Sequence, residues 1–370
     1  MRNFYPVKDS LLNDSDVGVG RVGIGYCTMK NNSEIYAKKN KDDKSEKYLS
    51  LSNTKCLKGV FAFAILVHHI YQYSLRFLPE TPAWGGVLQS LGYLSVGMFF
   101  FYTGYGLMLS SKREGYVVAF LGKHILPLYS FYVVLILAYA IYKNLLGIPI
   151  EVMKLVQSFF FGGTIVPLAW YLQTTFVLYL FYYAVFRLID KDTSRVSVMS
   201  AALVTYCIIC VLWELPTQWY ESVFCVLLGM MWAWKKERID RILKSKLKAT
   251  IVCSTLLFVA LTMLQWKYGI VIVKMFSSIF FAIMVTSLTY LLANTPVINN
   301  KVTQLFGKYS LEIYVSQGFF LLMGKHTDIF QNIYVFILTT LVGTMLTAAL
   351  MKPIYSGVTR GVRKLLKADK

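Results

Sequence analysis

Charged residues are scarce in this chain of 370 residues. They make up 15% of it, whereas a typical soluble domain has about 25%. Hydrophobic residues make up 56%, and apolar runs of roughly 20 residues recur, each long enough to cross the hydrocarbon core of a bilayer. These runs lack the alternation of a transmembrane β-barrel. The composition therefore excludes a soluble protein and predicts an all-α polytopic membrane protein, a bundle of about ten transmembrane helices.

Acidic residues are also few, with 19 Asp and Glu against 38 Lys and Arg. A net charge of +19 is typical of nucleic-acid-binding proteins, but here the basic residues follow the membrane topology. When the N-terminus is placed inside, 29 Lys and Arg fall in cytoplasmic segments and five in outer loops. This asymmetry predicts cytoplasmic N- and C-termini and needs no nucleic-acid partner. The spans are expected at residues 57–75, 87–109, 118–142, 167–189, 196–213, 219–234, 248–266, 271–293, 304–324 and 331–352.

The N-terminal 50 residues lack the layout of a cleavable signal peptide, in which basic residues precede an apolar stretch. We expect residues 1–50 to form a disordered basic cytoplasmic tail, 51–352 the membrane domain, and 353–370 a second basic cytoplasmic tail. The chain has six cysteines. Cys207 and Cys210 form a CxxC pair inside an apolar span, without the second pair of a metal centre. This pattern favours helix packing, and no metal is expected.

Ionisable groups inside the expected spans are rare. Glu312 is the only acidic residue well within a span, and the chain has four histidines. Ion-coupled transporters commonly bury several carboxylates along the permeation path. A single buried carboxylate is thin support for a transporter, although it does not exclude one.

Lys58, His68 and His69 lie in one apolar stretch, residues 57–74. On an α-helix, 11 residues make almost three turns and rise about 16.5 Å. Lys58 and His69 are therefore expected on one face at two depths, whereas His68 points away by roughly 100°. The conservative alternative is a lysine at the membrane edge and histidines that only pack. A neutral imidazole near pH 7 is suited to general-base work.

Two further segments contain small or polar residues among aromatic ones. Thr103, Gly104 and Tyr105 belong to "TGYG" (103–106), which favours close helix packing first and the lining of a site second. Residues 147–166 are interrupted by glycine and proline, and we interpret them as an outer loop with an interfacial or re-entrant portion that could roof a cavity.

Several of these segments resemble motifs of the acyltransferase-3 family of integral-membrane acyltransferases. "LKGVFAFAILVHH" (57–69) is similar to the first-helix signature, a basic residue, ten others and then histidine, which falls on Lys58 and His69. "SVGMFFFYTGYGLML" (95–109) looks like the second-helix pattern, in which a pair of phenylalanines precedes Ser/Thr-Gly-Phe/Tyr. The later matches are "KHILPLY" (123–129), "WYL" (170–172) and "GKYSLEIYVSQ" (307–317). The resemblance covers roughly residues 51–352.

The chain departs from this family's pattern at two positions. Lys55 stands where many relatives have aspartate, and Gln317 stands where the late motif usually ends in histidine. The second departure removes a candidate acid/base group, although Gln317 can still form a hydrogen bond.

The resemblance implies that an acyl group, expected to be acetyl, moves from cytoplasmic acyl-CoA to a hydroxyl of a carbohydrate or cell-envelope acceptor. Acyl-CoA is then a cosubstrate, and no bound cofactor is expected. His69 is expected to be catalytic, and either direct transfer or a covalent acyl-histidine is compatible with the motif. The alternatives are a polysaccharide or small-molecule transporter and a non-catalytic envelope-assembly partner. The expected donor-binding residues are Lys58, Lys123 and His124, and the expected site-lining residues are Thr103, Tyr105, Trp170, Glu312 and Gln317.

Overall fold

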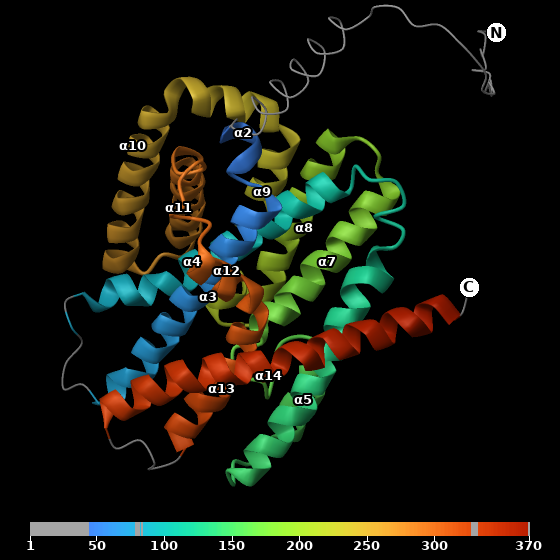
Figure 1. Cartoon of the computed structure of the whole chain (residues 1–370), viewed down its shortest axis with the longest axis vertical. Helices are drawn as coiled ribbons and strands as arrows, with labels where there is room; N and C mark the ends of the chain where they lie inside the picture. The colour runs from blue at the N-terminus through green and yellow to red at the C-terminus, as the bar shows by residue number, and fades with distance from the viewer. Residues whose placement is uncertain (1–43, 78–81, 83, 327–331, 369–370) are drawn as a thin grey trace, which may run out of the picture. The chain divides into compact units, whose positions relative to one another are not determined.

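A computed structural model describes residues 44–77, 82, 84–326 and 332–368 (Figure 1). Within these residues the regular structure is helical, with no β-strand. Short turns of other helix types occur at Leu75–Phe77, Leu121–Ile125 and Thr217–Trp219. The α-helices are α2 (Lys44–Lys47), α3 (Leu51–Ser74), α4 (Gly85–Ser110), α5 (Leu126–Leu145), α6 (Val152–Ser158), α7 (Trp170–Leu188), α8 (Asp192–Leu212), α9 (Phe224–Trp234), α10 (Lys236–Tyr268), α11 (Val271–Leu291), α12 (Lys301–Lys308), α13 (Ser310–His326) and α14 (Ile333–Ala368).

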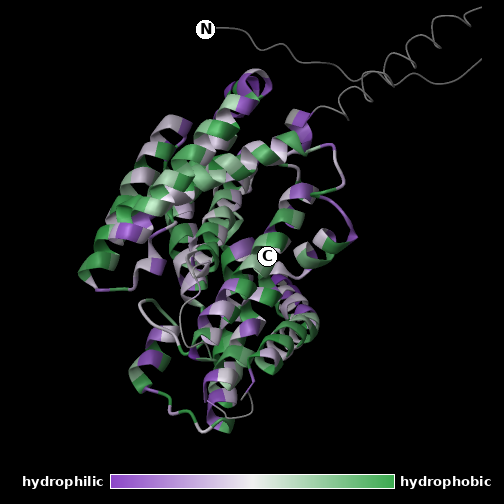
Figure 2. Cartoon of the chain, turned by 90° about the vertical axis from the view of Figure 1, so that its left-hand side faces the viewer, coloured by the Kyte–Doolittle hydropathy of each residue, from purple (hydrophilic) through white to green (hydrophobic). Residues whose placement is uncertain are grey.

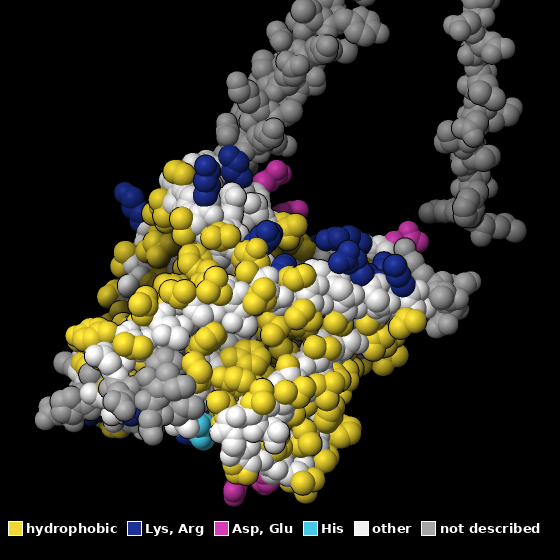
Figure 3. Space-filling model, turned by 60° about the horizontal axis from the view of Figure 1, so that its bottom comes forward, with side chains coloured by type: hydrophobic (Ala, Val, Ile, Leu, Met, Phe, Trp, Pro, Cys, Tyr) yellow, Lys and Arg dark blue, Asp and Glu magenta, His cyan; other side chains and the backbone are white. Residues whose placement is uncertain are grey.

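Five helical segments among the described residues are long and apolar enough to cross a membrane by length and composition. The hydropathy-coloured ribbon shows hydrophobic residues along most of the helices (Figure 2). The side chains on the face drawn in Figure 3 are mostly hydrophobic, with many Lys and Arg gathered toward its upper edge. The all-α membrane fold is thus confirmed. The remaining expected spans correspond to α3, α4, α7, α9 and α13, and their full crossing of the membrane stays a prediction. The five segments are Leu121–Leu145, Asp192–Leu212, Lys236–Tyr268, Val271–Leu291 and Ile333–Leu366.

Glycine contacts bring two helix pairs unusually close. A Cβ on Gly104 would lie 1.9 Å from the Val226 carbonyl oxygen, and one on Gly229 would lie 2.1 Å from the Phe101 carbonyl oxygen. These distances are far below contact, so α4 and α9 pack backbone to backbone, as "TGYG" predicted. A Cβ on Gly59 would likewise lie 2.2 Å from the backbone nitrogen of Gly307. The second contact fixes α3 against α12.

Helix α9 is shorter than the span expected at residues 219–234. It has 11 residues and a length of about 16.5 Å. Before it, residues 213–223 contain a 3₁₀ turn, Thr217–Trp219, and no α-helix. The first part of this expected span is therefore irregular backbone.

The expected disordered tail, residues 1–50, is wrong in its last residues. Tyr48 is fully buried, and its hydroxyl donates to Asp240 Oδ1 at 2.7 Å. Trp232 Nε1 donates to the Tyr48 hydroxyl at 2.9 Å. Ser50 then caps α3, accepting from the Asn53 backbone N–H at 3.3 Å. An aromatic side chain directly after a charged run thus anchors residues 44–50, whereas residues 1–43 lie outside the described residues.

The expected second tail, residues 353–370, continues α14 through Pro353 as far as Ala368. Figure 1 shows α14 in red, crossing α13 and α5 before it reaches the C-terminal end of the chain. Residues expected in a tail are therefore part of a helix.

Candidate functional site

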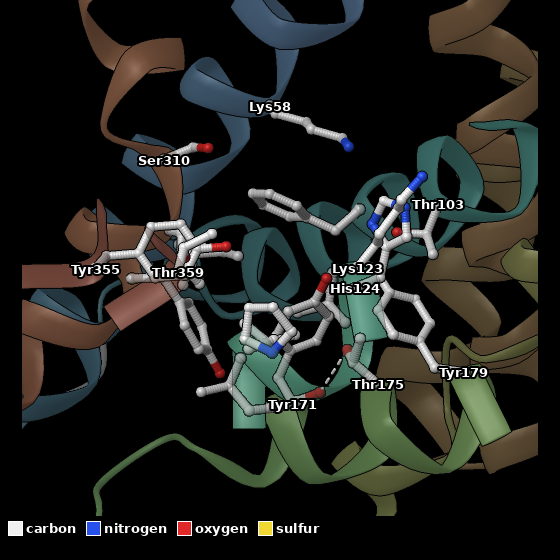
Figure 4. Close-up of a pocket in the computed structure, with 18 of the residues that line it drawn as sticks. Lys58, Thr103, Lys123, His124, Tyr171, Thr175, Tyr179, Ser310, Tyr355 and Thr359 are labelled. Carbon is white, nitrogen blue, oxygen red and sulfur yellow. Dashed lines mark hydrogen bonds between the residues drawn. The ribbon is translucent and has the colours of Figure 1, made fainter. Parts of the chain in front are cut away.

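A cavity of about 300 Å³, here called the basic cavity, opens between α3, α4, α5, α7, α13 and α14. Lys58 extends into it from α3, as Figure 4 shows, with Lys123 and His124 on the right-hand side of that view. Arg363, in the last turns of α14, adds another basic side chain. No Asp or Glu is among the described residues that line this cavity. Its other polar lining residues are Thr103, Tyr171, Thr175, Tyr179, Ser310, Tyr314, Tyr355 and Thr359.

Local structure explains how the basic residues meet in this cavity. Lys58 directly precedes Gly59. The close contact of Gly59 with the Gly307 backbone fixes the position of this part of α3 against α12, and with it the position of Lys58. Lys123 and His124 lie in a π-helical turn directly before α5. The His124 ring packs 5.0 Å from that of Phe120. Uncompensated cations with fixed positions attract an anion, and Lys and Arg both bind phosphate oxygens through charge-assisted hydrogen bonds.

A second cavity of about 230 Å³, here called the histidine cavity, lies against the other half of α3. His68 and His69 both line it, and Trp170 contributes from the start of α7. The other lining residues are Ile65, Gln72, Gln89, Gly92, Tyr93, Val96, Leu168, Thr217, Gln218, Glu221, Lys274 and Tyr314. Amides, hydroxyls, a carboxylate, an ammonium group and three aromatic rings of the Trp and Tyr type surround this space. Such a lining can bind a polyhydroxylated ligand through hydrogen bonds and ring contacts.

The tautomer of His69 follows from its hydrogen bonds. Its Nδ1 lies 3.2 Å from Gln317 Oε1, and Gln317 Nε2 donates to the Tyr314 carbonyl oxygen at 2.9 Å. Because the Gln317 amide donates through nitrogen to Tyr314, its oxygen faces His69 and accepts from Nδ1–H. The other ring nitrogen, Nε2, therefore has the lone pair. This is the form that can take a proton from a hydroxyl group.

Helix geometry predicted that His68 points away from the face of Lys58 and His69. In the structure, however, His68 lines the same cavity as His69. Its ring centroid is 5.0 Å from that of His69. Its Nδ1 donates to the Leu88 carbonyl oxygen at 2.9 Å. A Cβ on Gly92 would lie 2.4 Å from His68 Nε2, so α4 encloses this ring on the Nε2 side. Of the two histidines, His68 has its ring nitrogens engaged or covered by α4.

The sequence did not point to Glu221 and Lys274, which form an ion pair in the histidine cavity. Lys274 Nζ lies 2.7 Å from Glu221 Oε2, and the Thr217 hydroxyl donates to the same oxygen at 3.0 Å. Glu221 comes from the irregular segment before α9, and Lys274 from α11. The available signal was a lysine one turn inside an apolar span, which is rare without a functional or structural partner.

Three predicted residues lie outside the two cavities or only at their edge. Tyr105 is buried and stacks on Phe101 at 6.4 Å. Glu312 is buried and pairs with Lys352 on α14 at 2.9 Å. Gln317 contacts His69 without lining the histidine cavity. The structure thus brings His69, Gln317 and Trp170 together on one side and Lys58, Lys123, His124 and Thr103 on the other.

Residues 147–166, expected to roof a cavity, contain the short helix α6. Gln173 of α7 holds this segment, since its Nε2 donates to the Gly163 carbonyl oxygen at 2.8 Å. The chain then passes through Leu168, which lines the histidine cavity. Leu168 has φ of +67°, a backbone conformation that L side chains rarely adopt.

One known protein family matches most of this chain. A family model described as an acyltransferase domain matches residues 53–352. The chain belongs to the acyltransferase-3 family. No curated protein and no solved structure gave a match to this chain. The matched region of this acyltransferase includes His69 and most of both cavities and ends before Arg363.

Proposed function

We propose that this membrane acyltransferase moves an acetyl group from cytoplasmic acetyl-CoA to a hydroxyl of a carbohydrate or cell-envelope acceptor. The observation that carries the proposal is the pair of cavities along α3. One is basic and lacks carboxylates, and the other contains a histidine whose tautomer is set for proton abstraction. Both termini are cytoplasmic in this proposal, and the protein resides in the cell membrane.

The donor binds in the basic cavity. Lys58, Lys123, His124 and Arg363 contact the phosphates of CoA, with which their charges are complementary. The 11 residues from Lys58 to His69 correspond to a rise of about 16.5 Å, a length that suits an extended pantetheine arm. The thioester is then delivered toward His69, while the nucleotide stays at the cytoplasmic end.

The acceptor binds in the histidine cavity, where His69 Nε2 takes the proton of its hydroxyl. The acceptor oxygen attacks the thioester carbonyl carbon, so that the new C–O bond forms and the C–S bond breaks. The departing CoA thiolate receives the proton held by His69. Gln317 accepts from Nδ1–H throughout and stabilises the imidazolium formed in between.

The test uses the full-length protein in nanodiscs with radiolabelled acetyl-CoA and an envelope extract as the acceptor source. We expect label to enter the carbohydrate fraction and CoA to be released. His69→Ala should reduce turnover by about 10²–10⁴-fold, as for a lost general base, and His68→Ala by far less. Transfer at near the parent rate by folded His69→Ala protein contradicts the mechanism. Absence of CoA release by the parent favours a transporter or a non-catalytic partner.

A further inference from the structure

The two cavities share part of their walls. Ile65, Val96 and Tyr314 line both of them, and all three are nearly inaccessible, with exposed fractions of 1%, 5% and 5%. Two of these side chains are small or medium aliphatic groups. Tyr314 is the largest of the three and the only one with a polar group. It is therefore the part of the shared wall whose position is specified by a hydrogen bond.

Contacts on several sides fix the Tyr314 ring. Its hydroxyl donates to the Leu168 carbonyl oxygen, in a segment where Leu168 has the unfavourable φ of +67°. Its ring meets that of Tyr171 edge to face, with centroids 5.3 Å apart. A backbone conformation that is disfavoured for leucine thus presents a carbonyl group to this one hydroxyl.

The same residue is connected to the catalytic side through its backbone. Gln317 Nε2 donates to the Tyr314 carbonyl oxygen at 2.9 Å, while Gln317 Oε1 accepts from His69. The shared wall and the contact that sets the His69 tautomer therefore belong to successive turns of α13. A shift of the α13 backbone at Tyr314 would therefore move both the wall and the hydrogen-bond partner of His69, whereas a change confined to the Tyr314 ring leaves that partner in place.

We propose that Tyr314 is the barrier between the basic cavity, where the donor binds, and the histidine cavity, where the acceptor binds, and that it prevents hydrolysis of the donor. This inference rests on the proposed function. A thioester beside a general base is attacked by any nucleophile that reaches it. With water, a C–O bond forms to the acyl carbon, the C–S bond breaks, and acetate and CoA thiol are released. Tyr314 limits the access of water from the histidine cavity to the thioester and so favours transfer over hydrolysis.

The experiment measures CoA release from acetyl-CoA by full-length protein in nanodiscs with no acceptor added. Tyr314→Ala removes the ring from the shared wall, and we expect acceptor-independent release to rise above that of the parent. It should also exceed release by the His69→Ala/Tyr314→Ala double variant by about 10²-fold, because the hydrolysis needs the His69 base. Tyr314→Phe, which loses only the bond to Leu168, should give a smaller increase.

A matched control is Tyr139→Ala. Tyr139 is also buried, donates to the Val315 carbonyl oxygen of α13 at 2.8 Å and lies outside both cavities. This variant should not raise acceptor-independent release, and thermal unfolding of both variants reports their stability. If Tyr314→Ala and Tyr314→Phe release CoA no faster than the parent while His69-dependent transfer persists, the barrier is refuted and the proposed function stands. If no protein releases CoA with or without acceptor, the proposed function is refuted and the barrier with it.

Discussion

Replacement of Gln317 by methionine tests whether this residue orients the catalytic base. Methionine has a similar length and fills the buried site, but it cannot accept from His69 Nδ1 at the 3.2 Å distance seen here. A neutral hydrogen bond contributes about 0.5–1.5 kcal/mol, and one to a charged group about 1.5–3 kcal/mol. The bond becomes charge-assisted when His69 takes the proton. The transition state therefore loses roughly 1–1.4 kcal/mol more than the ground state, which lowers kcat about five- to tenfold.

The assay is steady-state acetyl transfer by the purified protein, with kcat and KM for acetyl-CoA measured separately. KM should stay near the parent value, because Gln317 does not line the basic cavity. Gln317→His, which introduces the residue usual in this motif, retains an acceptor for Nδ1–H and should recover most of the lost kcat. A Gln317→Met variant with an unchanged kcat, or with an effect only on KM, refutes the assigned orientation of the His69 ring.

Three further predictions concern the donor, the packing and the topology. Lys58→Ala should raise KM for acetyl-CoA with little effect on kcat. The control Lys55→Ala lies three residues earlier and outside the basic cavity, and it should leave KM unchanged. Equal KM values in the two variants count against donor binding by Lys58. Gly104→Ala should lower the free energy of unfolding by about 1–3 kcal/mol through overpacking, as measured by thermal unfolding in detergent. Gly106→Ala is the control, since nothing lies within 4 Å of its added Cβ, and similar unfolding temperatures in the two variants would contradict the close packing of α4 and α9. A reporter fused to the C-terminus should be cytoplasmic and one inserted at Gly147 outside; the opposite result at either site contradicts the topology.

The helices were largely predictable because apolar runs and loop charges both follow from the cost of burying charge in lipid. The motif spacing also singled out Lys58 and His69, which line two different cavities along α3; their roles stay predictions. The end of α14 was not predictable from hydropathy, because Arg363 lies in a polar stretch that continues a helix without continuing an apolar run.

The contacts that complete the site could not be found from one segment at a time. Lys274 and Glu221 are 53 residues apart in the chain, and only the packing of α11 against the segment before α9 brings them together. Likewise, helix periodicity separated His68 from His69 by angle, but the cavity is wide enough at this corner to meet both rings. The anchoring of Tyr48 depends on Asp240 and Trp232, which a local composition of charged residues does not reveal.

The shortness of α9 has a consequence for hydration. Its 11 residues span about half of a hydrocarbon core that is about 30 Å thick. Irregular backbone at membrane depth is tolerated only when protein covers it or when it faces water. The segment before α9 supplies Thr217, Gln218 and Glu221 to the histidine cavity, so polar side chains of this irregular backbone face a cavity. Under the proposed function, an acceptor that reaches His69 through this polar-lined cavity does not have to dissolve in lipid first.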